Sequence, residues 1–324
     1  MQDRETNKEM LERSRAGAGW TWWRLAEITA LKSTYRVPDG VKEKLPTDFD
    51  AVELRAIQIG DGLTAVIAYF RLTSPAAMKL DETWHARHEP QLVRGAGRPK
   101  AESREWATYR LTQTSRRSLH DAARGWMASR CPGFFAADNE PQLVMDLLLM
   151  DKFNPLTDGQ PERQFDNALR ALGITGHEVV HRTSPDIPKM LLLPVEGSLA
   201  PALESKRTWA LLGQRDAIAA AHEHLEYYGS EQNRAIAQLV DERMQNFLVI
   251  LAVSDFLSVM GARYATLRDR ARTYHETSKA NGLRQLRESF LTLSLDLTSV
   301  ARDVDAFRRR GWRQEGDAQF TLDY

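Results

Sequence analysis

A heptad pattern near the C-terminal end most constrains what this chain can fold into. Between residues 283 and 307, large apolar side chains recur at alternating spacings of three and four: Leu283, Leu286, Phe290, Leu293, Leu297, Val300, Val304 and Phe307. On an α-helix this spacing places them on one seam, the pattern of a helix packed along its length against another helix. We therefore predict a long helix here, and its seam needs a partner in this chain or in a second copy.

Two more long helices are expected upstream of the seam. The first covers about 205–228 and carries Leu211, Ile218 and Leu225 at heptad spacing. The middle helix covers about 231–276 and contains "FLVILAVSDFLSVM", in which 11 of 14 residues are apolar. A membrane span needs about 20 apolar residues, and Asp255 would lie near the bilayer centre at high cost. We therefore predict a helix buried in protein and no transmembrane span.

The N-terminal part of the chain carries the β-strand signals. "AVELRAIQIGDGLTAVIAYFRL", residues 51–72, has two β-branched and aromatic runs around a Gly-Asp-Gly turn, which predicts a hairpin. The second run is apolar at almost every position, as in a strand buried on both faces. "KMLLLPV" at 189–195 is typical of another buried strand.

These patterns together predict an α+β protein of two domains. Residues 1–200 would form an α+β domain with a small, partly buried sheet and helices around it. Residues 201–324 would form a bundle or antiparallel coiled coil of three long helices. A chain of 324 residues is long enough for two domains with cores of their own.

Composition excludes some classes of function and indicates a compartment. Lysine plus arginine equals aspartate plus glutamate at 44 each, so the global charge excess typical of nucleic-acid or anionic-membrane binding is missing. Cys131 is the only cysteine, which excludes an internal disulfide and fits a reducing compartment. No apolar leader is visible, and only 10 of the 44 basic residues are lysine, a bias common in GC-rich bacterial genomes. We expect a bacterial cytoplasmic protein.

"HEVVH" at 177–181 spells the short H-E-x-x-H signature of zinc hydrolases. On a helix, His177 and His181 would stand one turn apart as zinc ligands, and Glu178 could activate the bound water. Gly176 and Pro185 leave barely two turns, and two adjacent valines disfavour a helix. In a strand the two histidines would share one face while the glutamate points to the other. The strand is the more natural interpretation, and the zinc site is kept as the alternative.

A second histidine pair lies in "DETWHARHEP", residues 81–90. On a helix, Asp81, His85 and His88 could converge on a cation, although a polar, exposed helix face is the plainer interpretation. The arginines at 116–117 and 308–310 are likewise expected on a solvated face. Phosphate-binding loops, dinucleotide-binding glycine motifs and nucleophile elbows are not found in the sequence, so no complete catalytic set is apparent.

Three functional hypotheses follow. The leading one is an intracellular, non-enzymatic interaction or regulatory protein, in which the α+β domain senses or binds. Its C-terminal helices would hold a protein partner or a second copy, with no cofactor. The second is a zinc-dependent hydrolase using the HEVVH stretch. The third is the cytoplasmic part of a membrane-associated assembly: the layout resembles in outline the soluble part of CorA-type magnesium channels, although the Gly-Met-Asn signature and paired C-terminal spans of that family are missing here.

Overall fold

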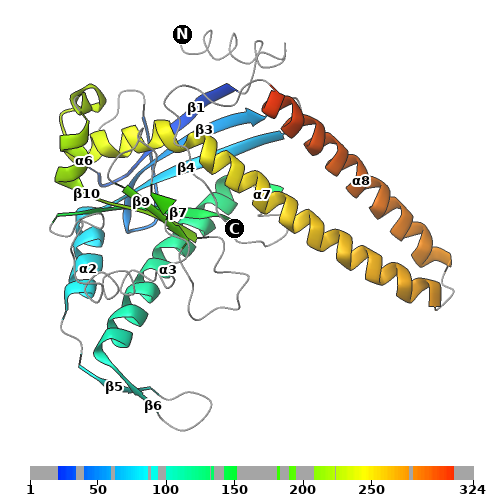
Figure 1. Ribbon diagram of the computed structural model, residues 1–324, viewed down its shortest axis with the longest axis horizontal. Coiled ribbons are helices and arrows are strands. Elements are labelled where there is room, and N and C mark those ends of the chain that lie inside the picture. The colour runs from blue at the N-terminus through cyan, green and yellow to red at the C-terminus, as the bar shows by residue number, and fades with distance from the viewer. Residues whose placement is uncertain are drawn as a thin grey trace. The chain divides into compact units, whose positions relative to one another are not determined.

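The computed structural model describes most of the chain and places its helices and strands as drawn in Figure 1. The described residues are 21–33, 40–59, 63–86, 89–93, 100–131, 133–134, 142–151, 181–182, 190–194, 208–222, 224–276 and 280–309. Within them the chain is an α+β protein, with small sheets in its N-terminal part and a helical C-terminal region. The predicted fold class is therefore confirmed.

The first sheet has four strands in the order β2-β1-β3-β4, with β1 and β2 parallel. The strands are β1 (Thr21–Ala30), β2 (Val41–Glu43), β3 (Phe49–Ile59) and β4 (Leu63–Leu72). β3 and β4 are neighbours joined by a short connection, so the hairpin predicted over 51–72 is confirmed. The prediction that the second run is buried on both faces is wrong. β4 lies at the edge of the sheet and its described side chains are half-buried or exposed, whereas β3 contributes the fully buried Val52 and Ile57.

Two helices follow the first sheet and pack against each other: α2 (Ser74–His85) and α3 (Arg104–Arg130). Each begins at a hydroxyl residue that accepts a hydrogen bond from a backbone N–H three residues on, namely Thr73 for α2 and Ser103 for α3. Between them, β5 (Gln91–Val93) and β6 (Lys100–Glu102) form a small antiparallel pair. A ladder of rings from Phe49 through Phe70 to Trp126, with centroids 5.0 and 5.6 Å apart, links β3, β4 and α3.

The second sheet is mixed and has the order β7-β10-β9-β8. Its strands are β7 (Val144–Met150), β8 (His181–Arg182), β9 (Met190–Pro194) and β10 (Thr208–Gln214). β10 is central, since it pairs in parallel with β7 and antiparallel with β9. Its Ala210, Leu211 and Leu212 are fully buried. The strand predicted at 189–195 is confirmed as β9.

The prediction of a long helix over 205–228 is wrong. This stretch holds β10, then the short α6 (Arg215–Ala221) and the single turn η3 (Leu225–Tyr228). Leu211, Ile218 and Leu225 are all buried, but in three different elements rather than on one helix face. A continuous apolar run is equally typical of a strand in the middle of a sheet. Here the run forms a strand because it pairs with β7 and β9.

The two remaining helices agree with the predicted ranges, although the apolar segment of the middle helix is only partly buried. α7 (Gln232–Glu276) and α8 (Ala280–Arg309) run side by side in opposite directions as a long hairpin (Figure 1). Near its tip, the ring of Tyr274 lies 3.0 Å from the place where a Cβ on Gly282 would be, so glycine allows the helices to approach closely there. The helical region thus contains two long helices where three were expected.

The chain divides into two compact units. One comprises Met1–Ala26, Leu54–Ala68 and Gln245–Glu315, and the other comprises Glu27–Glu53, Tyr69–Met244 and Gly316–Tyr324. In the first unit, Ile57 and Val249 are fully buried against Ile67 and Val253, which joins the strands of the β3–β4 hairpin to α7. The domain boundary predicted at residue 200 falls outside the described residues and stays a prediction.

Candidate functional site

The HEVVH stretch is described only at its end. His181 lies in β8, where it pairs with Leu192 of β9 in antiparallel register. His177 and Glu178 lie outside the described residues, so the proposed zinc ligands and their general base are not brought together in any described geometry. The zinc site stays a hypothesis, and the part of the stretch that is seen is a strand.

The second histidine cluster is an exposed helix end. Asp81 and His85 lie one turn apart at the end of α2, with the His85 Nδ1 3.1 Å from a carboxylate oxygen of Asp81. Both side chains are largely exposed, and His88 lies outside the described residues. Among the residues that the structure describes, no three His, Cys, Asp or Glu side chains are grouped as they would be to hold a metal ion.

The heptad seam of α8 is covered by α7 along one edge only. Leu286, Leu293 and Val300 are 7%, 6% and 6% exposed, so alternate members of the seam are buried. The other members of the seam are more exposed or are not described. Phe290, Leu297 and Val304 are half-buried, Leu283 is exposed, and the side chain of Phe307 is not described. Three members of the seam are therefore buried, and one neighbouring helix does not complete the burial of the rest.

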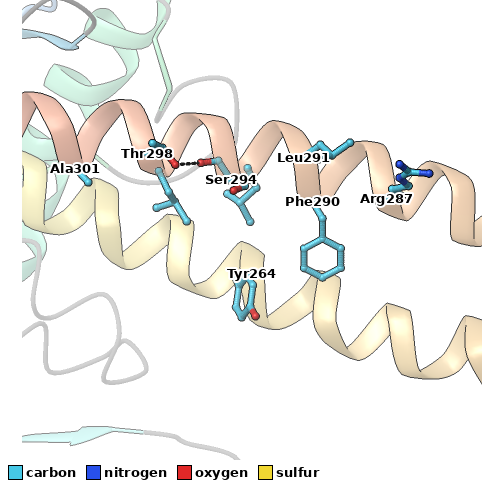
Figure 2. Close-up of a pocket in the computed structure, with 9 residues that line it drawn as sticks. Tyr264, Arg287, Phe290, Leu291, Ser294, Thr298 and Ala301 are labelled. Atoms are coloured by element: carbon cyan, nitrogen blue, oxygen red, sulfur yellow. Dashed lines mark hydrogen bonds between the residues drawn. The ribbon is translucent and has the colours of Figure 1, made fainter.

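The uncovered edge of the seam lines an open groove between α7 and α8, with a volume of about 650 Å³ (Figure 2). Tyr264 contributes from α7, and its ring meets that of Phe290 edge-on with centroids 5.8 Å apart. From α8 come Arg287, Phe290, Leu291, Leu293, Ser294, Leu297, Thr298 and Ala301. Leu291 in this lining is 55% exposed, and Leu295 outside it is 72% exposed. Large apolar side chains that remain this exposed on one helix face are typical of a docking surface.

The segment Phe247–Tyr274 of α7 is long and apolar enough to cross a membrane, with a mean hydropathy of 1.6 in its most apolar window. Only 33% of that window is buried. A single segment of this kind carries little weight, because the core helix of a soluble protein meets the same criteria. The absence of a transmembrane span therefore stays a prediction.

A buried ionic cluster joins α3 to β7, and sequence reasoning missed it. Arg116 donates from both Nε, at 3.0 Å, and Nη2 to one carboxylate oxygen of Asp146, and the His120 Nε2 lies 2.8 Å from the other. One turn further along α3, the Arg124 Nε donates to the backbone carbonyl of Gln142 at 2.8 Å. Arg116 is only 3% exposed, so the expectation of a solvated arginine face at 116–117 is wrong for this residue. The available signal was Asp146 itself, a single acid inside the apolar run "VMDLLLM".

The electrostatics of this cluster favour a charged pair. Burial by itself would raise the pKa of Asp146, but the Arg116 guanidinium and the His120 imidazole hold it well below its usual range. Asp146 is therefore ionised at neutral pH and Arg116 has its counter-charge. Among the described residues, no hydroxyl or thiol is hydrogen-bonded to His120, so the pairing of nucleophile and base that covalent catalysis needs is not seen. We assign the cluster a structural role, tying α3 to the second sheet.

Comparison with known proteins gives no relative: no protein-family model, no curated protein and no solved structure matches this chain.

Proposed function

We propose that this chain is an intracellular, non-enzymatic protein that acts through protein–protein contact, with the α7–α8 hairpin as its docking arm. The observation that carries the proposal is the half-covered seam. Leu286, Leu293 and Val300 are buried by one neighbouring helix, while Leu283, Leu291 and Leu295 stay exposed beside an open groove. Several large apolar side chains exposed beside an open groove are typical of a surface to which something binds.

The chemistry of the groove supports a helical partner. Its lining from α8 follows helical spacing along one side of the helix, from Arg287 to Ala301, a stretch of about 21 Å at 1.5 Å per residue. The aromatic rings of Tyr264 and Phe290 both line it, and aromatic side chains are the usual anchors of an interface. Single polar groups on the rim, such as Arg287 and Ser294, would set orientation rather than affinity.

The experiment is site-specific photo-crosslinking in cells that express the full chain. A photoreactive phenylalanine analogue replaces Tyr264 in one variant and Leu291 in another. The matched control is Thr292, which is exposed and, at 100° per residue, lies on the far side of α8 from Ser294. Protein adducts of defined mass from 264 and 291, with none from 292, are the expected result. Equal labelling from all three positions, or no protein adduct from the groove, would overturn the proposal.

Membrane association is the second candidate, and the apolar segment Phe247–Tyr274 is the observation that favours it. It predicts that the native protein sediments with membranes and that the groove positions crosslink to lipid instead of protein. Fractionation of the same cells shows whether the protein sediments with membranes, and the adduct masses show whether the groove positions crosslink to lipid or to protein. A fully soluble protein with protein adducts would dispose of this second candidate.

A further inference from the structure

A second heptad stripe runs along α8, beside the seam that α7 covers. Its members recur at spacings of 4, 3, 4, 3 and 4 residues: Arg287, Leu291, Ser294, Thr298, Ala301 and Asp305. The first five line the groove and are exposed, while Asp305 is half-buried. Figure 2 shows these five on α8, with Tyr264 on the neighbouring α7. A helix with two such stripes has the pattern of a bundle member that contacts two neighbouring helices.

The residues of this second stripe are complementary to the same stripe read in the opposite direction. When the stripe is laid antiparallel against a copy of itself, Arg287 faces Asp305, Leu291 faces Ala301 and Ser294 faces Thr298. A basic residue thus meets an acidic one, a large side chain meets a small one, and two hydroxyls meet at the centre. In a parallel arrangement each residue would face itself, so Arg287 would repel Arg287 and Asp305 would repel Asp305.

Between residues 247 and 305, the charges of the hairpin show the same polarity. Residues 263–289, around its tip, include seven lysines and arginines against three acidic residues. Residues 247–262 and 290–305, nearer its base, include four acidic residues, among them the buried Asp303, against one arginine. Arg308 and Arg309 follow at the C-terminal end of α8. Two hairpins that associate antiparallel place the basic tip of each one against the acidic base of the other. Complementary charge of this kind selects partner and orientation more than it adds affinity.

We propose that the occupant of the groove is a second copy of this chain, with the two α7–α8 hairpins packed antiparallel as a four-helix bundle about a two-fold axis. The axis crosses α8 at the level of Asp296, midway between Arg287 and Asp305. The uncovered members of the first seam, Phe290 and Leu297, then lie in the centre of the bundle with Tyr264. Such an interface is isologous, because the same surface is used by both copies. This inference rests on the proposed function and names the partner.

The first experiment measures self-association of the full chain by sedimentation velocity over a wide concentration range. Wild type is expected to form a dimer. Arg287→Asp and Asp305→Arg should each weaken dimerisation by about tenfold or more, because each places like charges at both ends of the interface. An equimolar mixture of the two variants restores opposite charges at both ends and should recover dimers that neither variant forms alone. Thr292→Asp is the matched control off the stripe and should leave the dimer unchanged.

The second experiment tests direction and register without charge reversal, in case one reversal impairs folding. In a Cys131→Ser background, Ser294→Cys in one chain and Thr298→Cys in the other should form a disulfide when mixed. Each variant alone should crosslink poorly. Efficient disulfides of Ser294→Cys with itself, or a wild-type monomer at all concentrations, would overturn the inference.

The two proposals fail in different ways. Groove adducts to another protein, together with a monomer by sedimentation, would leave the docking function standing and remove the second copy as its partner. Binding to vesicles of anionic phospholipid by the monomer would instead place a lipid surface in the groove and overturn both. A dimer whose assembly is unaffected by Arg287→Asp, Asp305→Arg and Leu291→Glu would show that the copies meet elsewhere.

Discussion

Replacing Asp146 with leucine should lower the free energy of unfolding by about 3–5 kcal/mol, because it removes the carboxylate that pairs with the buried Arg116 guanidinium. The geometry sets this magnitude. Arg116 is almost fully buried and directs two donors at one carboxylate oxygen, while His120 occupies the other. When the carboxylate is removed, the guanidinium charge remains in a buried place where water cannot take over the lost interaction. For a chain with a typical stability of about 5–15 kcal/mol, this loss is a large fraction of the total.

Two matched variants separate the charge from the packing. His120→Gln removes one hydrogen-bond partner but keeps the Arg116–Asp146 pair, so it should cost only about 1 kcal/mol. The double variant Arg116→Met with Asp146→Leu replaces the ion pair by apolar side chains of similar size. It should be more stable than the Asp146→Leu single variant, since no buried charge is left alone.

The assay is urea unfolding followed by far-ultraviolet circular dichroism, with fluorescence of the tryptophans as a second probe of the same transition. Equal slopes among the variants would show that their unfolded and native states are comparable. The reasoning is refuted if Asp146→Leu costs less than about 1 kcal/mol, or if the effects of Asp146→Leu and of Arg116→Met, each measured alone, simply add in the double variant.

Two further predictions concern pH and backbone entropy. The pKa of Asp146 is lower in the folded protein than in the unfolded chain, where it is about 3.9. The ion pair therefore contributes its full stabilisation above the unfolded pKa and loses it as the pH falls below that value. Wild type should lose more stability between about pH 5 and pH 2 than Asp146→Leu does. Thermal unfolding across that range checks it, and parallel curves would contradict it. Gly125→Ala in α3 should raise stability by about 0.5–1 kcal/mol, because a Cβ there meets nothing within 4 Å. Gly282→Ala should lose that gain, because its Cβ would meet the Tyr274 ring at 3.0 Å; a similar gain at both glycines in urea unfolding would contradict this account.

Periodic local patterns predicted the parts of the fold that local geometry controls. The seam of α8 was visible because a helix repeats its environment every three or four residues, and its members Leu286, Leu293 and Val300 are buried as that repeat requires. The β3–β4 hairpin was visible because the sequence Gly-Asp-Gly lies between two β-branched runs. In both cases the pairing partner lies close by in sequence.

Features that depend on distant partners were missed. β10 was mistaken for a helix because its strand neighbours, β7 and β9, lie elsewhere in the chain and its own apolar run fits either structure. Arg116 was placed in solvent because its counter-charge, Asp146, is 30 residues away. The groove was missed for a related reason. Heptad spacing predicts which side chains of α8 face a neighbouring helix. Only the geometry of α7 shows which of these side chains α7 leaves exposed.

The central place of β10 has a consequence for the order in which the protein is made. Among the described strands, β7 pairs only with β10, which follows it by almost 60 residues. At a synthesis rate of about 5–20 residues per second, the apolar β7 waits on the order of 3–12 s on the ribosome without its partner. During that interval its unpaired edge is open to other nascent chains, so the yield of native protein should depend on chaperone capacity and on translation speed through residues 151–207.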